Sequence, residues 1–302
     1  MAVGITLSST SSYASTAKTV IAAQLYARAN NAVMTALVNP YTQPSGSAIT
    51  NFGTVSRIAA SGLTEGVDLA APEQLAVKIT ATNPTEKGVI VFITDKLERE
   101  SSYPIKNVVA RVLADASTKK IDDDGLTQID SFSKSAPGAS STLDITHFRG
   151  AMAYLSTDQD TAYGPAPMPR AAVLHPEQIS DIVLELSDPA SRVVPMGEGL
   201  GVNVLQNWLR GFSKVYGVAV FEDGNITRNA GDDAKGAIFA RTTDSNPPNG
   251  ALYYATEKTP RVETERDISM RGTEWGSFWD DQWGEMVDTW GVEIFSDAAT
   301  TI

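Results

Sequence analysis

The chain has 302 residues, 42% of them hydrophobic, so it is long enough to bury a sizeable core in one large or two medium domains. It contains no Cys, which excludes disulfides, thiolate nucleophiles and Cys-based metal sites. Its net charge is −12 and no basic stripe is visible, which argues against a sequence-reading DNA binder. No run approaches the ~18 apolar residues of a membrane span, and residues 1–18 lack the pattern of a secretory signal.

The first 50 residues predict an extended segment followed by one helix. Residues 1–17 are rich in Ser and Thr and are expected to be extended or disordered. Residues 17–37 carry a weak apolar stripe, which includes Ile21, Leu25 and Val33 and predicts a helix that stops near Pro40. A turn-rich linker is expected over residues 41–47.

Residues 53–60 and 74–81 predict two strands that flank a polar tip at residues 61–72. The tip carries Gly62, Glu65, Gly66 and Asp68, which are typical of a mobile loop. Neither strand is strongly apolar on either face, so a core would gain little from burying them. Because an isolated hairpin is marginal in water, we favour an arm that projects toward a neighbour. An ordinary hairpin on a globular domain is the alternative.

A strand and an amphipathic helix follow the arm. Residues 89–94 form a β-rich apolar run. The helix is expected from about residue 105, with Ser102 as its N-cap and Pro104 in its first turn. Its apolar face is Ile105, Val108, Val109, Val112, Leu113 and Ala116. The run Asp122-Asp123-Asp124-Gly125 is expected to end the helix as a solvated turn, since its spacing does not fit a calcium-binding EF-hand loop.

Residues 138–254 predict an α/β unit that begins after a Ser/Ala/Pro/Gly linker at residues 129–138. Its first helix follows the capping-box-like Ser141-Thr-Leu-Asp144, and its second begins at Pro176. Strands are expected at residues 170–174, 215–221 and 237–241. The remaining features are a Pro-rich loop at 163–169, a Gly-rich stretch at 196–201 and a short helix at 203–210.

The C-terminal third returns to β structure, with strands expected at residues 251–256, 261–271 and 284–295. Four of the five Trp residues lie close together, at Trp275, Trp279, Trp283 and Trp290. They are interleaved with Glu274, Asp280, Asp281, Glu285 and Asp288. Aromatic rings beside paired carboxylates are what a glycoside-hydrolysing cleft requires. Nothing in the spacing pairs two carboxylates, so we favour a structural patch that packs domains or subunits together.

No residue set predicts a catalytic, cofactor or metal site, and we expect no enzyme activity. His147 and His175 are the only His residues, and each lacks a nearby acidic ligand motif, so structural roles are favoured. A G-x-S-x-G nucleophile elbow is absent. The stretch Gly197-Glu-Gly199-Leu-Gly201 does not fit G-x-G-x-x-G and no Lys-Ser/Thr follows it, so it is interpreted as a flexible loop.

The order of arm, strand and long helix over residues 52–125 resembles the major capsid proteins of tailed bacteriophages, which have the Hong Kong 97 phage fold. The resemblance is one of layout over most of the chain. It implies an α+β fold with four parts. These are an N-terminal arm and helix (1–50), an extended loop (51–88), a peripheral domain with a long spine helix (89–137 and 255–302) and an axial domain (138–254).

The same resemblance implies a structural function, namely self-assembly into hexamers and pentamers of an icosahedral head around double-stranded DNA. It implies a scaffolding protein, a portal and a decoration protein as partners, packaged DNA held without sequence preference, and no membrane. The protein would be part of the virion and would assemble in the host cytoplasm. Candidates for contacts between subunits are Gly62, Glu65, Gly66 and Asp68 on the loop, and Trp275, Trp279 and Trp283.

Two alternatives stay open. Encapsulin-type compartments resemble the same fold but load protein cargo in place of DNA. A carbohydrate-binding or glycoside-hydrolase protein that uses the Trp- and Asp-rich C-terminal segment is the alternative from a different class. The contents of purified particles distinguish the first, and glycan binding by a monomer distinguishes the second.

Overall fold

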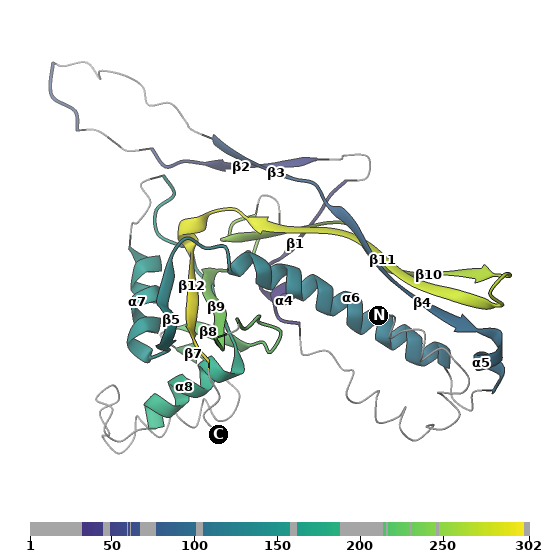
Figure 1. Cartoon of the computed structure of the whole chain (residues 1–302). Helices are drawn as coiled ribbons and strands as arrows, with labels where there is room; N and C mark the ends of the chain where they lie inside the picture. The colour runs from purple at the N-terminus through teal and green to yellow at the C-terminus, as the bar shows by residue number, and fades with distance from the viewer. Residues whose placement is uncertain are drawn as a thin grey trace.

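A computed structural model of the chain shows three β-sheets arranged around one long helix (Figure 1). Two of the sheets form the body of the molecule, and the third is a two-stranded arm that projects from it. The structure describes residues 32–44, 49–58, 60, 62–66, 77–100, 105–157, 162–187, 214–215, 217–229, 231–245 and 248–298.

The long helix α6 (Ile105–Ile129) packs along a four-stranded sheet. The order of the sheet is β1 (Pro40–Thr42), β10 (Leu252–Asp267), β11 (Gly272–Glu285) and β4 (Thr85–Thr94). A buried cluster joins β4, α5 (Asp95–Glu100) and α6, and consists of Ile93, Leu97, Ile105, Val109 and Leu113. The predicted strand at 89–94 is confirmed. Of the predicted apolar face of the helix, Ile105, Val109 and Leu113 are buried, whereas Val112 is 43% exposed.

The two strands predicted at residues 251–256 and 261–271 are one strand, β10. Its pairing with β11 is irregular between Thr256 and Arg261, around Pro260. β1 pairs with β10 only from Tyr254 to Thr256, so beyond that point one edge of β10 has no strand partner among the described residues. A proline lacks the N–H that an inner strand needs, but an edge strand tolerates it, which is why the predicted break was wrong.

α6 does not end at the Asp122-Asp123-Asp124-Gly125 run, as the sequence predicted, but continues to Ile129. Asp122 is buried, and its Oδ1 accepts the backbone N–H groups of Val33 at 2.9 Å and Met34 at 3.0 Å. A Cβ at Gly125 would lie 3.0 Å from Met34 and 3.3 Å from the ring of Trp283. The expected solvated turn was wrong because other segments of the chain pack against Asp122 and Gly125, and the helix continues through this run.

The second sheet has six strands, in the order β5 (Ser135–Thr142), β12 (Gly291–Asp297), β9 (Asp233–Ala240), β6 (Arg170–Leu174), β8 (Val218–Glu222) and β7 (Lys214–Val215). β6 is buried along its whole length. The buried face of α7 (Ile145–Ser156) packs on this sheet, and α8 (Pro176–Ser187) follows β6. The strand predicted at 170–174 and the helices predicted at 145–155 and from Pro176 are confirmed.

Three expectations for this sheet were wrong. Residues 135–142 form β5, parallel to β12, and not a linker. The strand predicted at 215–221 is a hairpin of β7 and β8. The strand predicted at 284–295 is divided between β11, the 3-10 helix η1 (Asp288–Trp290) and β12. For β5 and β12, pairing with strands distant in sequence decides the structure, and local composition does not report such pairing.

The arm consists of β2 (Thr50–Val55) and β3 (Val77–Thr82), which pair antiparallel with each other only. Both predicted strands exist, with their bounds shifted by a few residues. Figure 1 shows the arm extending away from the two larger sheets. Of the expected tip, residues 62–66 are described and the rest lies outside the described residues.

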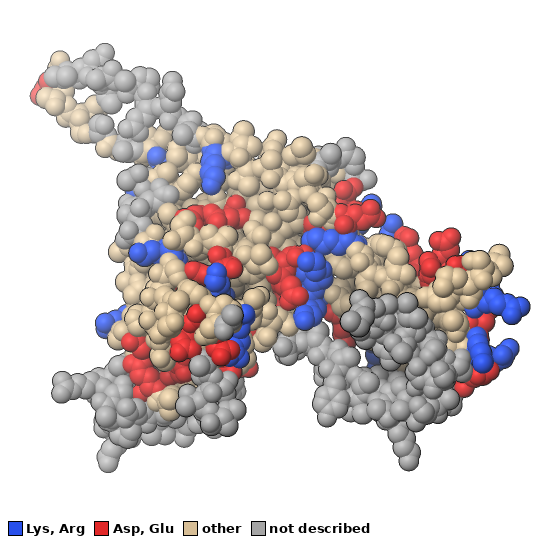
Figure 2. All heavy atoms as spheres, in the orientation of Figure 1, with Lys and Arg blue, Asp and Glu red and all other residues tan. Residues whose placement is uncertain are grey.

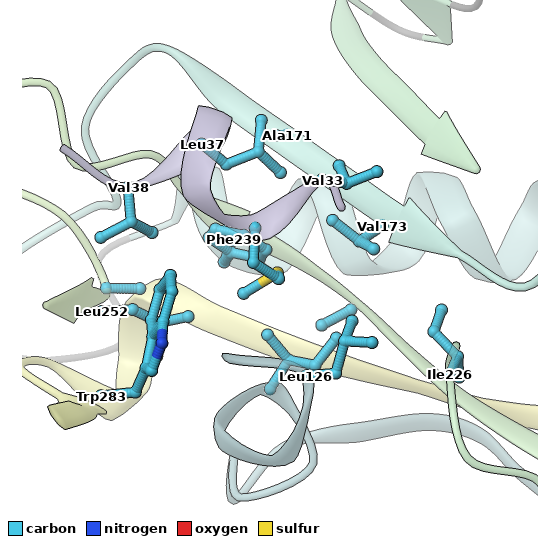
Figure 3. Close-up of a cluster of buried hydrophobic side chains, with 14 of the residues drawn as sticks. Val33, Leu37, Val38, Leu126, Ala171, Val173, Ile226, Phe239, Leu252 and Trp283 are labelled. Atoms are coloured by element: carbon cyan, nitrogen blue, oxygen red, sulfur yellow. The ribbon is translucent and has the colours of Figure 1, made fainter. Parts of the chain in front are cut away.

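The described part of the N-terminal region is short but deeply packed. Of the helix predicted over residues 17–37, the structure describes α4 (Met34–Leu37). Residues 41–42 of the expected linker belong to β1. Figure 3 shows the core that α4 enters, with side chains from Val33, Leu37, Val38, Leu126, Ala171, Val173, Phe239, Leu252 and Trp283. Residues 1–17, the Gly-rich stretch at 196–201 and the helix at 203–210 lie outside the described residues.

Candidate assembly surfaces

One face of the arm is apolar and open to solvent. The register of β2 and β3 places Val55 opposite Val77 and Gly53 opposite Ile79, so these residues share a face. The side chains of Val55, Val77 and Ile79 are 51%, 49% and 65% exposed. The interpretation that neither face is strongly apolar was wrong, because this face is assembled from both strands together. We call Val55, Val77 and Ile79 the arm face.

The opposite face of the arm is anchored to its own subunit. Phe52 is 3% exposed and packs on the rings of Tyr41 and Tyr253, with centroids 5.0 Å and 5.4 Å away. Past the tip-side end of β2, the Arg57 N–H donates to the carbonyl of Ala162 at 2.7 Å. The arm is therefore held to its own subunit by Phe52 and Arg57, while the arm face remains exposed.

The tip of the arm carries the predicted contact candidates Gly62, Glu65 and Gly66, and all three are exposed. Gly66 has a φ of +78°, which favours glycine, and lies in a turn. Asp68 lies outside the described residues. Figure 2 shows that the part of the arm not drawn in grey carries few charged side chains. The role of these residues as contacts stays a prediction.

The four-stranded sheet has a second exposed face, on the side away from α6. A hollow of about 350 Å³ lies on it. Its floor includes Ile90, which is 57% exposed, and the ring of Phe278, which lies over Gly88 and Gly276. On its rim Glu265 stands directly opposite Glu274 across two paired strands. Like charges opposite each other are unfavourable, so this face is a second candidate surface for contacts.

Three Trp residues of the cluster lie on β11 and the fourth, Trp290, lies in η1, and all four pack inside the subunit. Trp279 and Trp283 are buried in the largest core cluster, and Trp283 stacks on Tyr254 with ring centroids 4.4 Å apart. Trp275 is partly buried against the cluster formed by β4, α5 and α6. Trp290 is partly buried, and its Nε1 donates to the carbonyl of Gly164 at 3.1 Å. Within one subunit, the rings of Trp279 and Trp283 leave little surface for a neighbour.

Two of the carboxylates beside the Trp residues, Asp280 and Asp281, form ion pairs. Lys87 Nζ lies 2.6 Å from Asp281 Oδ1 and 2.7 Å from Asp124 Oδ2, which joins β4, β11 and α6. Burial raises the pKa of Asp281 above its ordinary value, although Lys87 opposes the shift. Lys258 Nζ lies 2.9 Å from Asp280 Oδ2. Because neighbouring residues of a strand point to opposite faces, Asp280 and Asp281 do not face each other as a glycosidase pair must.

The His residues have structural surroundings. His147 Nδ1 lies 2.8 Å from Asp144, the N-cap residue of α7. His175 is mostly buried, and that burial lowers its pKa. Within the described residues, no group of three or more His, Asp or Glu side chains is placed to hold a metal ion. A membrane-spanning helix would have to be longer or more apolar than any helix in the described part of the chain.

Comparison with solved structures gives matches over most of the chain. A chain from the capsid of Ralstonia phage GP4 aligns with a TM-score of 0.64 and 11% identity, covering 92% of this chain and 91% of that one. The capsid structure of the cyanophage P-SCSP1u gives 0.63 and 13%, covering 89% of each chain. An encapsulin complex from Synechococcus elongatus gives 0.55 and 9%, covering 92% of this chain and 95% of that one.

No family model matches the chain, and no curated protein matches it in sequence. The structural likeness shows the fold, which is the α+β Hong Kong 97 phage fold that the order of arm, strand and helix predicted. In that layout β2 and β3 correspond to the extended loop, and α6 corresponds to the spine helix.

Proposed function

We propose that the chain is the major capsid protein of a tailed phage. Many copies assemble as hexamers and pentamers into an icosahedral head that encloses double-stranded DNA. The observation that carries this proposal is the arm face, because an exposed apolar face on a two-stranded sheet requires a partner to cover it. The similar solved structures include the capsids of two phages, which supports the same proposal.

The proposed mechanism is repeated weak association. Each subunit contacts several copies of itself, so modest contacts combine into a stable shell. The tip residues Gly62, Glu65, Gly66 and Asp68 would lie across a neighbour, together with the arm face. Of the Trp candidates, the partly buried Trp275 retains the most surface, while Trp279 and Trp283 would act by holding the subunit rigid.

The proposal includes further partners and a location. A separate scaffolding protein, a portal and a decoration protein would bind the shell, and packaged DNA would be held without sequence preference. A net charge of −12 is consistent with a shell that binds its packaged DNA only weakly. The protein would assemble in the host cytoplasm and remain in the virion, with no enzyme activity. Residues 1–50, 51–88, 89–137 with 255–302, and 138–254 would be its four parts.

Electron microscopy of the purified protein tests the proposal. We expect closed shells or capsomers, and nuclease-resistant DNA inside particles taken from infected cells. A stable monomer at every concentration, even with a scaffolding protein supplied, would contradict the proposal. The encapsulin-like match supports the second candidate, a protein compartment, which predicts particles that contain an enzyme and no DNA.

A further inference from the structure

Two buried carboxyl groups meet where three segments of the chain join. Asp122 lies in the middle of α6 and is 0% exposed, and Asp223 follows β8 and is 1% exposed. Asn225 binds both. Its backbone N–H donates to Asp223 Oδ1 at 2.9 Å, and its Nδ2 donates to Asp122 Oδ2 at 3.3 Å. Because Asp122 also accepts the N–H groups of Val33 and Met34, this pair ties the start of α4 and the turn after β8 to α6.

One oxygen of this pair has no donor when both groups are ionised. Asp223 Oδ2 is buried and receives no hydrogen bond from a described residue. The Asp223 carboxyl nevertheless lies within hydrogen-bonding reach of the Asp122 carboxyl. Two buried carboxylates in contact repel each other, whereas one proton between them turns the contact into a hydrogen bond. The geometry is therefore complete only when the pair holds a proton.

The surrounding charges favour that proton. From α6, the charged groups that act on Asp223 are Asp122 and Asp123, both acidic. The segment before α4 contributes backbone N–H groups through Val33 and Met34, and they bind Asp122. Lys87 and Lys120, the cations bound nearby on this side of α6, are engaged by Asp124. Burial and the neighbouring acids raise the pKa of Asp223 to about 7.

We propose that a proton shared by Asp122 and Asp223 is a clasp that fastens residues 33–34 and the turn at residues 223–225 onto α6. Removal of the proton leaves two buried charges in contact and opens the clasp. All of its groups belong to one subunit, so the inference goes beyond the proposed function and does not depend on it. An open clasp would loosen the six-stranded sheet, which carries β8, from the helix that supports the four-stranded sheet.

The direction of the pH dependence follows from the raised pKa. Such a carboxyl contributes stability that is fully present below its ordinary value of 3.8 and is lost as pH rises through about 7. The clasp is therefore closed in acid and loosens as pH rises toward neutral. Between the ordinary pKa of 3.8 and about 7, each pH unit weakens the closed state about tenfold, and above about 7 the loss is complete.

Hydrogen exchange of the Val33 and Met34 amides in the unassembled full chain tests the clasp. After correction for the intrinsic exchange rate, we expect protection to fall roughly thirtyfold between about pH 5 and pH 6.5 and to level off above about pH 7. In Asp223→Asn the side-chain amide donates to Asp122 at every pH, so protection should stay constant. Asp181→Asn is the matched control, because burial raises the pKa of Asp181 to about 6 on α8, away from the clasp.

Two results would overturn the clasp. One is protection in the natural sequence that does not change with pH. The other is the same loss of protection in Asp223→Asn as in the natural sequence. If Asp223→Asn does not fold, the pH profile of the natural sequence decides alone, with Asp181→Asn as its reference.

Discussion

The arm and the middle of α6 differ in which side chains they bury. On the arm, Val55, Val77 and Ile79 are about half or more exposed, although they are apolar. Around the middle of α6, even Asp122 and Asp281 are buried, although they are polar. On the arm face, apolar side chains remain open to solvent within the subunit. Around the middle of α6, polar side chains find hydrogen-bond or ion-pair partners within it.

Substitutions in the two regions should therefore affect different properties: the stability of the single subunit in one case and assembly in the other. The middle of α6 contacts α4, β4, β11 and the turn after β8. Figure 3 shows Leu126 of α6 in one cluster with Leu37 of α4 and Trp283 of β11. A change there removes contacts that hold the single subunit together. The arm contacts the body through Phe52, Arg57 and Lys78, none of which belongs to the arm face, so a change on the arm face costs the subunit little. Such a change should reduce only the association of one subunit with another.

The largest expected effect on the subunit comes from Trp279→Ala. The ring is buried in the main core cluster, so its removal should cost about 3–5 kcal/mol of the free energy of unfolding. Denaturant unfolding of the unassembled protein measures this loss. Calorimetric titration of the natural sequence with oligosaccharides should show no specific binding. Tight sugar binding that the substitution abolishes would restore the glycosidase alternative.

Lys87→Met should have the next largest effect. It leaves Asp281 and Asp124 without the ammonium group that lies 2.6 Å and 2.7 Å away, and breaking a buried ion pair costs roughly 3 kcal/mol. Burial already raises the pKa of Asp281, so protonation can relieve the unpaired charge in acid. The loss should therefore be larger at neutral pH than in mild acid, which unfolding at the two pH values measures.

Lys258→Met is the control for that prediction. Lys258 also pairs with an aspartate of β11, Asp280, but its own side chain is half exposed. Pairs open to solvent contribute little. A loss as large as that of Lys87→Met would show that burial does not separate these two pairs.

Much of the fold follows from periodicity in the sequence. The buried face of α7, the buried run of β6 and the paired strands of the arm were predicted correctly, and so was half of the apolar face of α6. The misses have one physical cause. Whether Asp122 faces water, and whether Pro260 breaks a strand, depends on segments distant in sequence that local patterns do not report.

The candidate surfaces were less predictable than the fold. Glu65 and Gly66 marked the tip because turn residues are recognisable in sequence. The arm face was missed, because it appears only when the register of β2 and β3 is known. Asp223 carries no signal in the sequence at all, since its neighbour Asp122 lies on a different element.

Shortening the arm should separate folding from assembly. Residues 63–71 would be replaced by a short Gly-Ser linker. Because closure entropy changes by only about 0.6 kcal/mol per doubling of loop length, the circular dichroism of the unassembled subunit should stay normal. The yield of shells should fall, because the lost contact recurs in every subunit. Unfolded subunits would place the hairpin in the core, and unchanged shells would remove its role.

The smallest expected effect on the subunit is that of Ile79→Ser. Ile79 is 65% exposed, so the free energy of unfolding should change by no more than about 0.5 kcal/mol. The shell yield should still fall, since the substitution weakens the arm face in every copy. Thr54→Ala, on the opposite face of β2, is the matched control. Its shell yield should be higher than that of Ile79→Ser.

The central claim is that a second copy of the chain covers the arm face. Hydrogen exchange compared between the unassembled subunit and the assembled particle tests it most directly. We predict a large gain in protection at residues 50–55 and 77–82, and little change along the buried face of α6, which is already packed in the subunit. An arm that exchanges equally fast in both states would contradict the claim.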